Sequence, residues 1–463
     1  MSISPHLPPD EIRHLFAQAM SRMYRDEVPL YGDLMDLVTE VNAATLGADP
    51  ALAARLQRSD ALDRLDAERH GAIRVGTPRE LATLRRLFAV MGMQPVGYYD
   101  LAVAGVPVHA TAFRPVDAAS LARNPFRVFT SLLRLELIED AALRETAAAI
   151  LEAREIFTPR ALALIERFEQ AGGLTADEAA EFVAEALETF RWHSEATVSH
   201  ATYQALLAAH RLIADVVCFR GPHINHLTPR TLDIDAAQAA MQARGIDAKA
   251  VIEGPPRRRC PILLRQTSFK ALQEPVLFPA GGSADAGTHT ARFGEIEQRG
   301  LALTPKGRAL YDALLARARE TDGAGSTGDY AARLAAAFTA FPDDDDTLRR
   351  EGLGYYRYAL TDAGRADPSA VTRVGIDTAI AAGLATADPV VYEDFLPVSA
   401  AGIFQSNLGS EARETAYAVD PAKADFEQAL GRSVLDEMAL YQAEQEASIA
   451  AALKALGLAE AAA

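Results

Sequence analysis

The alternation of apolar and polar residues predicts a β-α-β-β-β unit in the first third of the chain. The run "RHGAIRV" at residues 69–75 is typical of a short strand. It is followed by "TPRE" at 77–80, a capping box with proline at the first helical position. Apolar residues then mark one face of a helix that ends at Gly92. Strand-like runs follow at 96–103, 106–113 and 126–138.

A second stretch, which begins with "HINHLTPRTLDID" at His223, has the same order of elements. Asp233 is a suitable N-cap for a helix that ends near Gly245. The pattern does not place every strand of this second unit firmly. We expect strands in the segments after the helix, at 248–254, 260–272 and 290–303.

The two units can be aligned on their helix starts. His70 precedes the N-cap Thr77 by seven residues, and His226 precedes the N-cap Asp233 by seven, whereas His223 precedes it by ten. If the units are copies of one fold, His70 and His226 hold equivalent positions on the first strand. His226 is then the metal-ligand candidate, and His223 is its neighbour.

The last strand of the second unit carries two acidic residues, Glu295 and Glu297, in "FGEIEQRG". Side chains alternate along a strand, so both point to the same side, and periodicity does not choose between them. Two histidines and one carboxylate that leave open positions are typical of non-haem Fe(II) oxygenases.

Two further polar residues are candidates for substrate contacts. Residues 70, 72 and 74 share one face of an extended strand, so Arg74 should project to the same side as His70. A guanidinium there could bind a substrate carboxylate through two hydrogen bonds. Gln266, on the apolar strand "LLRQTSFKAL", is suited to orient a substrate oxygen.

These patterns predict an α+β fold in which two βαβββ units carry large helical insertions. The stretches between and after the units are rich in Ala, Leu and Glu and have helical periodicity. We expect six segments: an N-terminal helical segment 1–66, the first βαβββ module 67–138, a helical insertion 139–212, the second module 213–300, a second helical insertion 301–390, and 391–463, which covers the site and ends in helices.

Composition narrows the possible partners. The net charge of −17 argues against nucleic acid, because the phosphates would be repelled. No apolar run approaches the ~18 residues of a membrane span, so no membrane association is expected. The N-terminus lacks the pattern of a secretory signal, and Cys218 and Cys260 form no disulfide framework. We therefore expect a cytoplasmic protein; the sequence makes no prediction of its oligomeric state.

Several long motifs in order make the chain similar to a known family. They are "MYRDEVPLYGDL", "ERHGAIRVGT", "GPHINHLTPRTLDID", "LLRQTSFKAL", "FGEIEQRGLALTPKGRALYD" and "FLPVSAAGIFQSNL". With these the chain resembles the bacterial 2-oxoadipate dioxygenase/decarboxylase family, also called hydroxyglutarate synthase. That family looks like a distant relative of 4-hydroxyphenylpyruvate dioxygenase in the vicinal oxygen chelate superfamily.

The resemblance implies a fold and a site. Paired βαβββ modules would form a half-open β-barrel around one Fe(II), held by His70, His226 and Glu295. Glu295 is the acid that aligns with the metal-binding glutamate of "F-x-E-I-x-Q-R", and Glu297 takes a position that is apolar in the dioxygenase relatives. The resemblance also implies Arg74 for the distal substrate carboxylate, with Val398 and Ser399 of "PVSAAG" close to it.

The function implied is an Fe(II)-dependent conversion of 2-oxoadipate and O2 to 2-hydroxyglutarate and CO2, in lysine catabolism. The partners would be a small 2-oxo dicarboxylate and O2. One alternative is another vicinal oxygen chelate metalloenzyme that acts on a different 2-oxo acid. A further alternative is a metalloprotein that binds a dicarboxylate without turnover.

Overall fold

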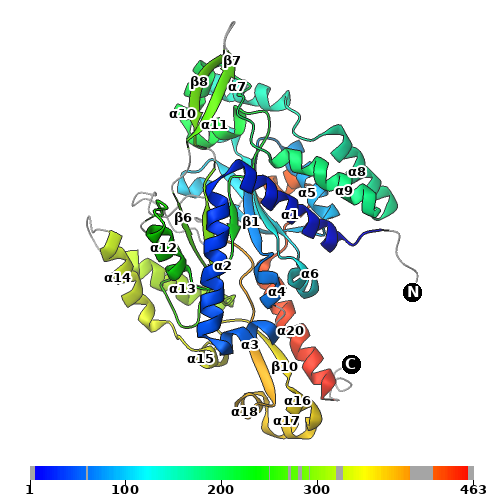
Figure 1. Cartoon of the computed structure of the whole chain (residues 1–463), viewed down its shortest axis with the longest axis vertical. Helices are drawn as coiled ribbons and strands as arrows, with labels where there is room; N and C mark the ends of the chain where they lie inside the picture. The colour runs from blue at the N-terminus through cyan, green and yellow to red at the C-terminus, as the bar shows by residue number, and fades with distance from the viewer. Residues whose placement is uncertain are drawn as a thin grey trace.

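The computed structural model is a mixed α+β protein (Figure 1). It describes residues 6–456, apart from 59–60, 250, 270–272, 280–283, 291, 320–326 and 397–420. At its centre lies a five-stranded sheet with the strand order β2-β3-β4-β1-β5. Four helices precede the sheet in the chain: α1 (Pro9–Glu27), α2 (Leu30–Ala48), α3 (Pro50–Arg58) and α4 (Ala61–Leu65).

The first unit has the predicted β-α-β-β-β order. Thr77 caps the helix, with the capping box to Glu80 complete. β1 pairs with β4 in parallel, whereas β2–β3 and β3–β4 are antiparallel. The elements are β1 (Arg69–Val75), α5 (Pro78–Val90), β2 (Gln94–Asp100), β3 (Val108–Arg114) and β4 (Arg127–Leu133). A short helix that was not expected, α6 (Ala118–Arg123), lies between β3 and β4.

The second unit is less regular. β5 (Leu227–Pro229) is followed by α12 (Ile234–Ala243), which Asp233 caps as predicted. β6 (Leu264–Ser268) and β9 (Glu295–Arg299) pair antiparallel. The strand expected at 248–254 is reduced to isolated bridges, from Ala248 to Phe269 and from Glu253 to Gln266. The two bridges are out of register with each other by two residues, so they do not join into one ladder.

The two units meet along β5. This strand pairs antiparallel with β1, so that His70 lies opposite Thr228. On its other side, Arg230 bridges to Glu297 of β9, and the Thr231 amide donates to the Glu297 carbonyl at 2.7 Å. The first strand of each unit therefore lies beside the other, and β9 follows next.

Helices, one hairpin and a further two-stranded sheet surround these strands. The 139–212 segment contains the helices α7 (Ala141–Glu152), α8 (Pro159–Ala171), α9 (Ala176–Leu187) and α10 (His200–Ala209), and α11 (Arg211–Val217) follows. An unexpected hairpin, β7 (Glu274–Pro279) with β8 (Ala284–His289), is inserted between β6 and β9 and lies at the top of Figure 1.

The segment predicted as the second helical insertion also contains strands. β10 (Tyr356–Leu360) pairs antiparallel with β11 (Ala385–Pro389). The tyrosines of β10 favour a pleated, half-buried strand. The strand was not predicted, because the surrounding sequence has helical periodicity. The helices of this segment are α13 (Pro305–Arg319), α14 (Thr327–Ala337), α15 (Asp345–Arg350), α16 (Asp362–Ala366), α17 (Pro368–Val374) and α18 (Ile376–Ala381).

Two helices close the described chain, α19 (Pro421–Leu430) and α20 (Glu437–Ala455). α20 packs against β10 (Figure 1). Among the described residues, no helix is long and apolar enough to cross a membrane.

The central sheet has an apolar core on each face. Ile73 and Val75 of β1 belong to one core, whereas Ala72 belongs to the other, together with Phe129 and Phe395. His70 and Arg74 share the face of Ala72, because alternate residues of a strand point to the same side. The polar site described next therefore lies against the second core.

Candidate metal centre

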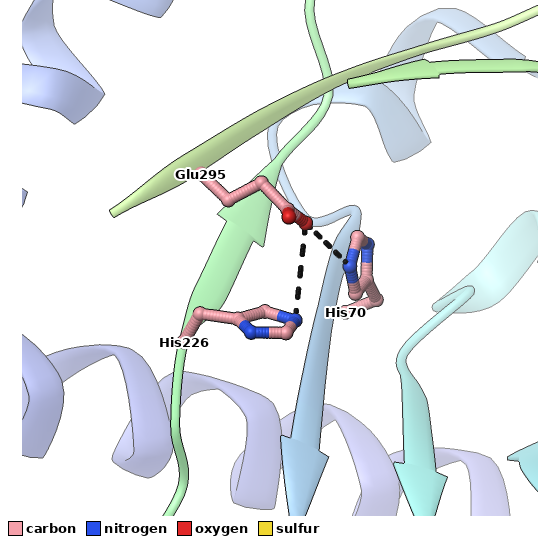
Figure 2. Close-up of side chains that lie close together, drawn as sticks. All are labelled: His70, His226 and Glu295. Atoms are coloured by element: carbon pink, nitrogen blue, oxygen red, sulfur yellow. Dashed lines mark hydrogen bonds and ion pairs between the residues drawn. The ribbon is translucent and has the colours of Figure 1, made fainter. Parts of the chain in front are cut away.

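Three buried side chains from three strands or strand ends converge. His70 comes from β1, His226 directly precedes β5, and Glu295 begins β9. One ligand atom of each lies within 4.8 Å of the others, and each residue is at most 2% exposed. Figure 2 shows both imidazoles turned toward the Glu295 carboxylate, whose Oε1 lies 3.1 Å from His70 Nε2 and 3.8 Å from His226 Nε2.

A glycine permits this approach of β1 and β5. A Cβ atom added at Gly71 would lie 2.5 Å from Ile224 Cδ1 and 3.0 Å from the His226 carbonyl oxygen. Both distances are too short for ordinary packing. The absence of a side chain next to His70 thus lets the two histidine-bearing segments lie together.

Two neighbouring donors fix the Glu295 carboxylate. The Thr228 hydroxyl and the Gln266 Nε2 amide each donate to Oε1, both at 2.9 Å. Gln266 was predicted to orient a substrate oxygen; its amide instead donates to a candidate metal ligand, and a substrate contact stays a prediction. Thr228 lies two residues after His226, and strand alternation could have identified it.

Glu297 lies on the far side of His70. Its Oε2 is 2.9 Å from His70 Nδ1, and its Oε1 accepts a hydrogen bond from Arg299 Nε at 2.8 Å. The two glutamates do share a side of β9, as alternation predicted. They contact opposite nitrogens of one imidazole, and only Glu295 also approaches His226.

Behind Glu297 lies a buried cluster of ion pairs. Glu68 accepts hydrogen bonds from Arg64, Arg127 and Arg230. Glu393 pairs with Arg64 and Arg127, and the neighbouring Asp394 with Arg114. Together with Glu295, Glu297 and Arg299, these are five carboxylates and five guanidinium groups within the described chain, each at most 6% exposed.

Burial and these charges shift the ionisation of the site. Burial lowers the pKa of His226 to about 4, so its imidazole is neutral at physiological pH. Burial alone would lower the pKa of His70 too, but Glu297 and then Glu295 raise it above its ordinary value. Despite burial, Arg299 and His70 hold the pKa of Glu297 at about 2.

A second polar cluster surrounds Asp215 of α11. Its Oδ2 lies 2.9 Å from Arg74 Nη1, and its Oδ1 lies 2.9 Å from His289 Nε2 and 3.6 Å from His223 Nε2. Asn225 Nδ2 lies 3.1 Å from His223 Nε2. Arg74 thus occupies the predicted face of β1, and His223 is a neighbour rather than a member of the converging set. No pattern in the sequence pointed to Asp215.

The remaining predicted positions, Val398 and Ser399, lie outside the described residues. Shortly before them, the ring of Phe395 packs edge-on against His70, with the ring centroids 5.0 Å apart. Sequence analysis missed this aromatic contact.

The donor set fits a divalent metal ion. Two imidazole nitrogens and one carboxylate oxygen face a common point, the carboxylate is anchored by Thr228 and Gln266, and the surroundings are buried. Such a set leaves coordination positions open for other molecules. Fold and site together define a mixed α+β protein with a candidate mononuclear metal centre.

Comparison with known proteins identifies the family of this chain. The chain belongs to the 2-oxoadipate dioxygenase/decarboxylase family, whose model matches residues 16–407. The 2-oxoadipate dioxygenase/decarboxylase of Escherichia coli (strain K12) is 60% identical over 442 residues, which cover 95% of this chain and 97% of that protein. The protein of the same name from Pseudomonas putida is 57% identical and covers 99% of both chains.

A solved structure agrees with this assignment. The hydroxyglutarate synthase from Pseudomonas putida in complex with 2-oxoadipate is 56% identical, with a TM-score of 0.91. The match covers 98% of this chain and 100% of that one. The family resemblance found in the sequence motifs is thereby confirmed.

Proposed function

We propose that this protein is an Fe(II)-dependent dioxygenase that converts 2-oxoadipate and O2 to 2-hydroxyglutarate and CO2. The observation that carries the proposal is the convergence of His70, His226 and Glu295 in a chain of this family. The Pseudomonas putida relative, a hydroxyglutarate synthase solved with 2-oxoadipate, supports the choice of substrate. The reaction balances, since one carbon leaves as CO2 and both O2 atoms are retained in the products.

We assign the metal to His70 Nε2, His226 Nε2 and Glu295. Bound Fe(II) would supply Lewis acidity and open positions for the 2-oxo acid and O2. Thr228 and Gln266 would hold Glu295 in its ligating orientation. The apolar ring of Phe395 against His70 would keep bulk water from that side of the centre.

Arg74 is proposed to bind the distal carboxylate. It lies four residues along β1 from His70, and Asp215 anchors its guanidinium. A guanidinium with a fixed position would hold the far end of a six-carbon dicarboxylate and so determine which carbon faces the metal. Val398 and Ser399 are proposed to lie near the same carboxylate.

The half-open barrel, the six-segment division and the cellular location are also part of this proposal. The β1–β5 pairing and the β5–β9 bridge support two modules that enclose the metal as a half-open barrel. The division into six segments, with 391–463 covering the site, fits the same arrangement. A cytoplasmic location would suit a reduced Fe(II) centre.

Anaerobic loading with Fe(II), followed by 2-oxoadipate and O2, tests the function. We expect O2 consumption, CO2 release and 2-hydroxyglutarate formation in equal amounts, measured with an oxygen electrode and by mass spectrometry. Glu295→Gln should lose bound iron and product formation. The control Glu274→Gln removes a buried carboxylate that pairs with Arg292, outside the centre, and should keep both. Product without O2 consumption, or without CO2, would contradict the proposal.

A further inference from the structure

The two imidazoles of the centre differ in the groups that lie next to their Nδ1 atoms. His70 Nδ1, the nitrogen that faces away from Glu295, is 2.9 Å from Glu297 Oε2. For His226 the contact with an acidic residue, Glu295, is made by Nε2, and its Nδ1 has no hydrogen-bond partner in the described chain. His70 Nδ1 and Glu297 Oε2 lie at ion-pair distance, but, like His226 Nδ1, neither atom meets the geometry of a hydrogen bond within the described residues. Among the described residues, a carboxylate thus lies at ion-pair distance from Nδ1 of His70 but not from Nδ1 of His226.

The two oxygens of Glu297 have separate partners. Oε1 accepts from Arg299 Nε at 2.8 Å and lies 4.0 Å from Arg127 Nη1. Oε2 faces His70. With Glu297 fully buried, these arginines compensate its negative charge while leaving one oxygen for the imidazole.

We propose that Glu297 is a positioning residue for the metal ligand His70. Its carboxylate accepts a hydrogen bond from Nδ1–H of His70, so that Nε2 carries no proton and its lone pair faces the metal. The negative charge of the carboxylate makes Nε2 a stronger electron-pair donor to the metal. The inference rests on the proposed metal centre and extends it, because it assigns a role to the second glutamate of "FGEIEQRG". His70 becomes the stronger of the two imidazole ligands.

The geometry also explains why Glu297 does not take the place of Glu295 as a ligand. Its carboxylate lies against Nδ1 of His70, on the opposite edge of the ring from Nε2. In addition, no contact between Glu297 and His226 is found at ion-pair distance among the described residues, whereas Glu295 reaches both imidazoles.

Metal affinity tests the proposal without relying on turnover. Wild type and Glu297→Gln are titrated anaerobically with Fe(II) or Co(II) against a chromophoric chelator. We expect the dissociation constant to rise about 10- to 100-fold in the variant, the usual effect of losing such a partner.

Glu68→Gln is the matched control, since it removes the same charge from the same arginine cluster without touching His70. It should weaken binding much less. Equal affinity in wild type and Glu297→Gln, or an equal loss in both variants, would overturn the inference. If wild type itself binds no metal, the proposed function fails first, so the two failures are distinguishable.

A second measurement shows directly which ring nitrogen of His70 carries the proton. In wild type loaded with diamagnetic Zn(II), nitrogen-15 NMR of the histidine rings should show His70 with its proton on Nδ1, and this proton should lie downfield. His70→Gln assigns the signal, and Glu297→Gln should move it upfield. A metal-loaded His70 without a proton on Nδ1, or an Nδ1 proton with the same shift in wild type and Glu297→Gln, would refute the role of Glu297 whatever the affinities.

Discussion

The guanidinium of Arg74 pairs with the carboxylate of Asp215, which also contacts a histidine. Asp215 contacts Arg74 through one oxygen and His289 through the other. Burial would raise the pKa of Asp215, but His223, His289 and Arg74 lower it, so the carboxylate stays ionised. A ligand carboxylate that reaches Arg74 would therefore meet a guanidinium already fixed in direction.

Replacing Arg74 by alanine should raise the KM for 2-oxoadipate on the order of 100-fold, because a charged hydrogen-bonded pair contributes roughly 1.5–3 kcal/mol. Iron content should stay near that of wild type. Steady-state kinetics with 2-oxoadipate and with 2-oxohexanoate, which lacks the distal carboxylate, give a direct check. The variant should lose its preference for the dicarboxylate; an unchanged KM would rule out this role.

At the scale of single residues, the sequence identified the side chains that converge at the candidate metal centre. It did not identify the residues that hold them in place. The register of two helix caps selected His70 and His226, and alternation narrowed the acid to Glu295 or Glu297. Periodicity did not choose between these, whereas the family resemblance implied Glu295. The distances to both imidazoles depend on how β9 lies against β5, which no local pattern contains. Asp215 and Phe395 come from segments far away in the chain, and no local pattern could place them.

Among the elements, the contact between β1 and β5 depends on Gly71. It lies between His70 and Ala72, where a methyl group would meet the Ile224 side chain and the His226 backbone. The Ile224 side chain could move, but the backbone oxygen is part of the chain that carries the histidine. A change here should affect the fold and the metal centre together.

Gly71→Ala should therefore lower the free energy of unfolding by about 1–3 kcal/mol and weaken metal binding. Denaturant unfolding and metal titration measure the two effects. Gly47→Ala is a suitable control, since Gly47 lies near the end of α2 with nothing within 4 Å of the added Cβ. That variant should gain up to about 1 kcal/mol. A Gly71→Ala protein as stable as wild type would contradict the packing argument.

Elements with strong local signals were predicted well, and weakly marked ones were not. The capping box and the apolar face of α5, and the alternating runs of β2 to β4, agree with the structure. The strand expected at 248–254 is only two isolated bridges, and neither the β7–β8 hairpin nor the two-stranded β10–β11 sheet was expected. Their formation depends on pairing partners and packing that periodicity does not contain.

For the whole molecule, stability in mild acid should depend on the buried His109 of β3. Its ring packs against Phe426 of α19 with centroids 4.7 Å apart, and burial lowers its pKa from 6.5 to about 4. The unfolded chain takes up a proton near pH 6.5, whereas the folded chain does so only near pH 4. The contribution to stability is thus complete above about pH 6.5 and is lost as the pH falls toward 4.

In wild type, this residue should account for up to about 3 kcal/mol of the stability lost between pH 7 and pH 4. His109→Phe should lose correspondingly less over that range, as measured by denaturant unfolding at a series of pH values. A substitution of the exposed His200 tests whether any histidine replacement has this effect. Parallel pH profiles for wild type and His109→Phe would contradict the assignment.

The equal numbers of buried guanidinium groups and carboxylates around the centre have a consequence for how tightly the metal ion and a dianionic ligand bind together. A divalent cation alone would leave two uncompensated positive charges in a poorly hydrated interior, and a dianion alone would leave two negative ones. Bound together, the two cancel. Cation and dianion should therefore each strengthen the retention of the other, by the reciprocity of linked equilibria, and a mono-anionic analogue should do so less.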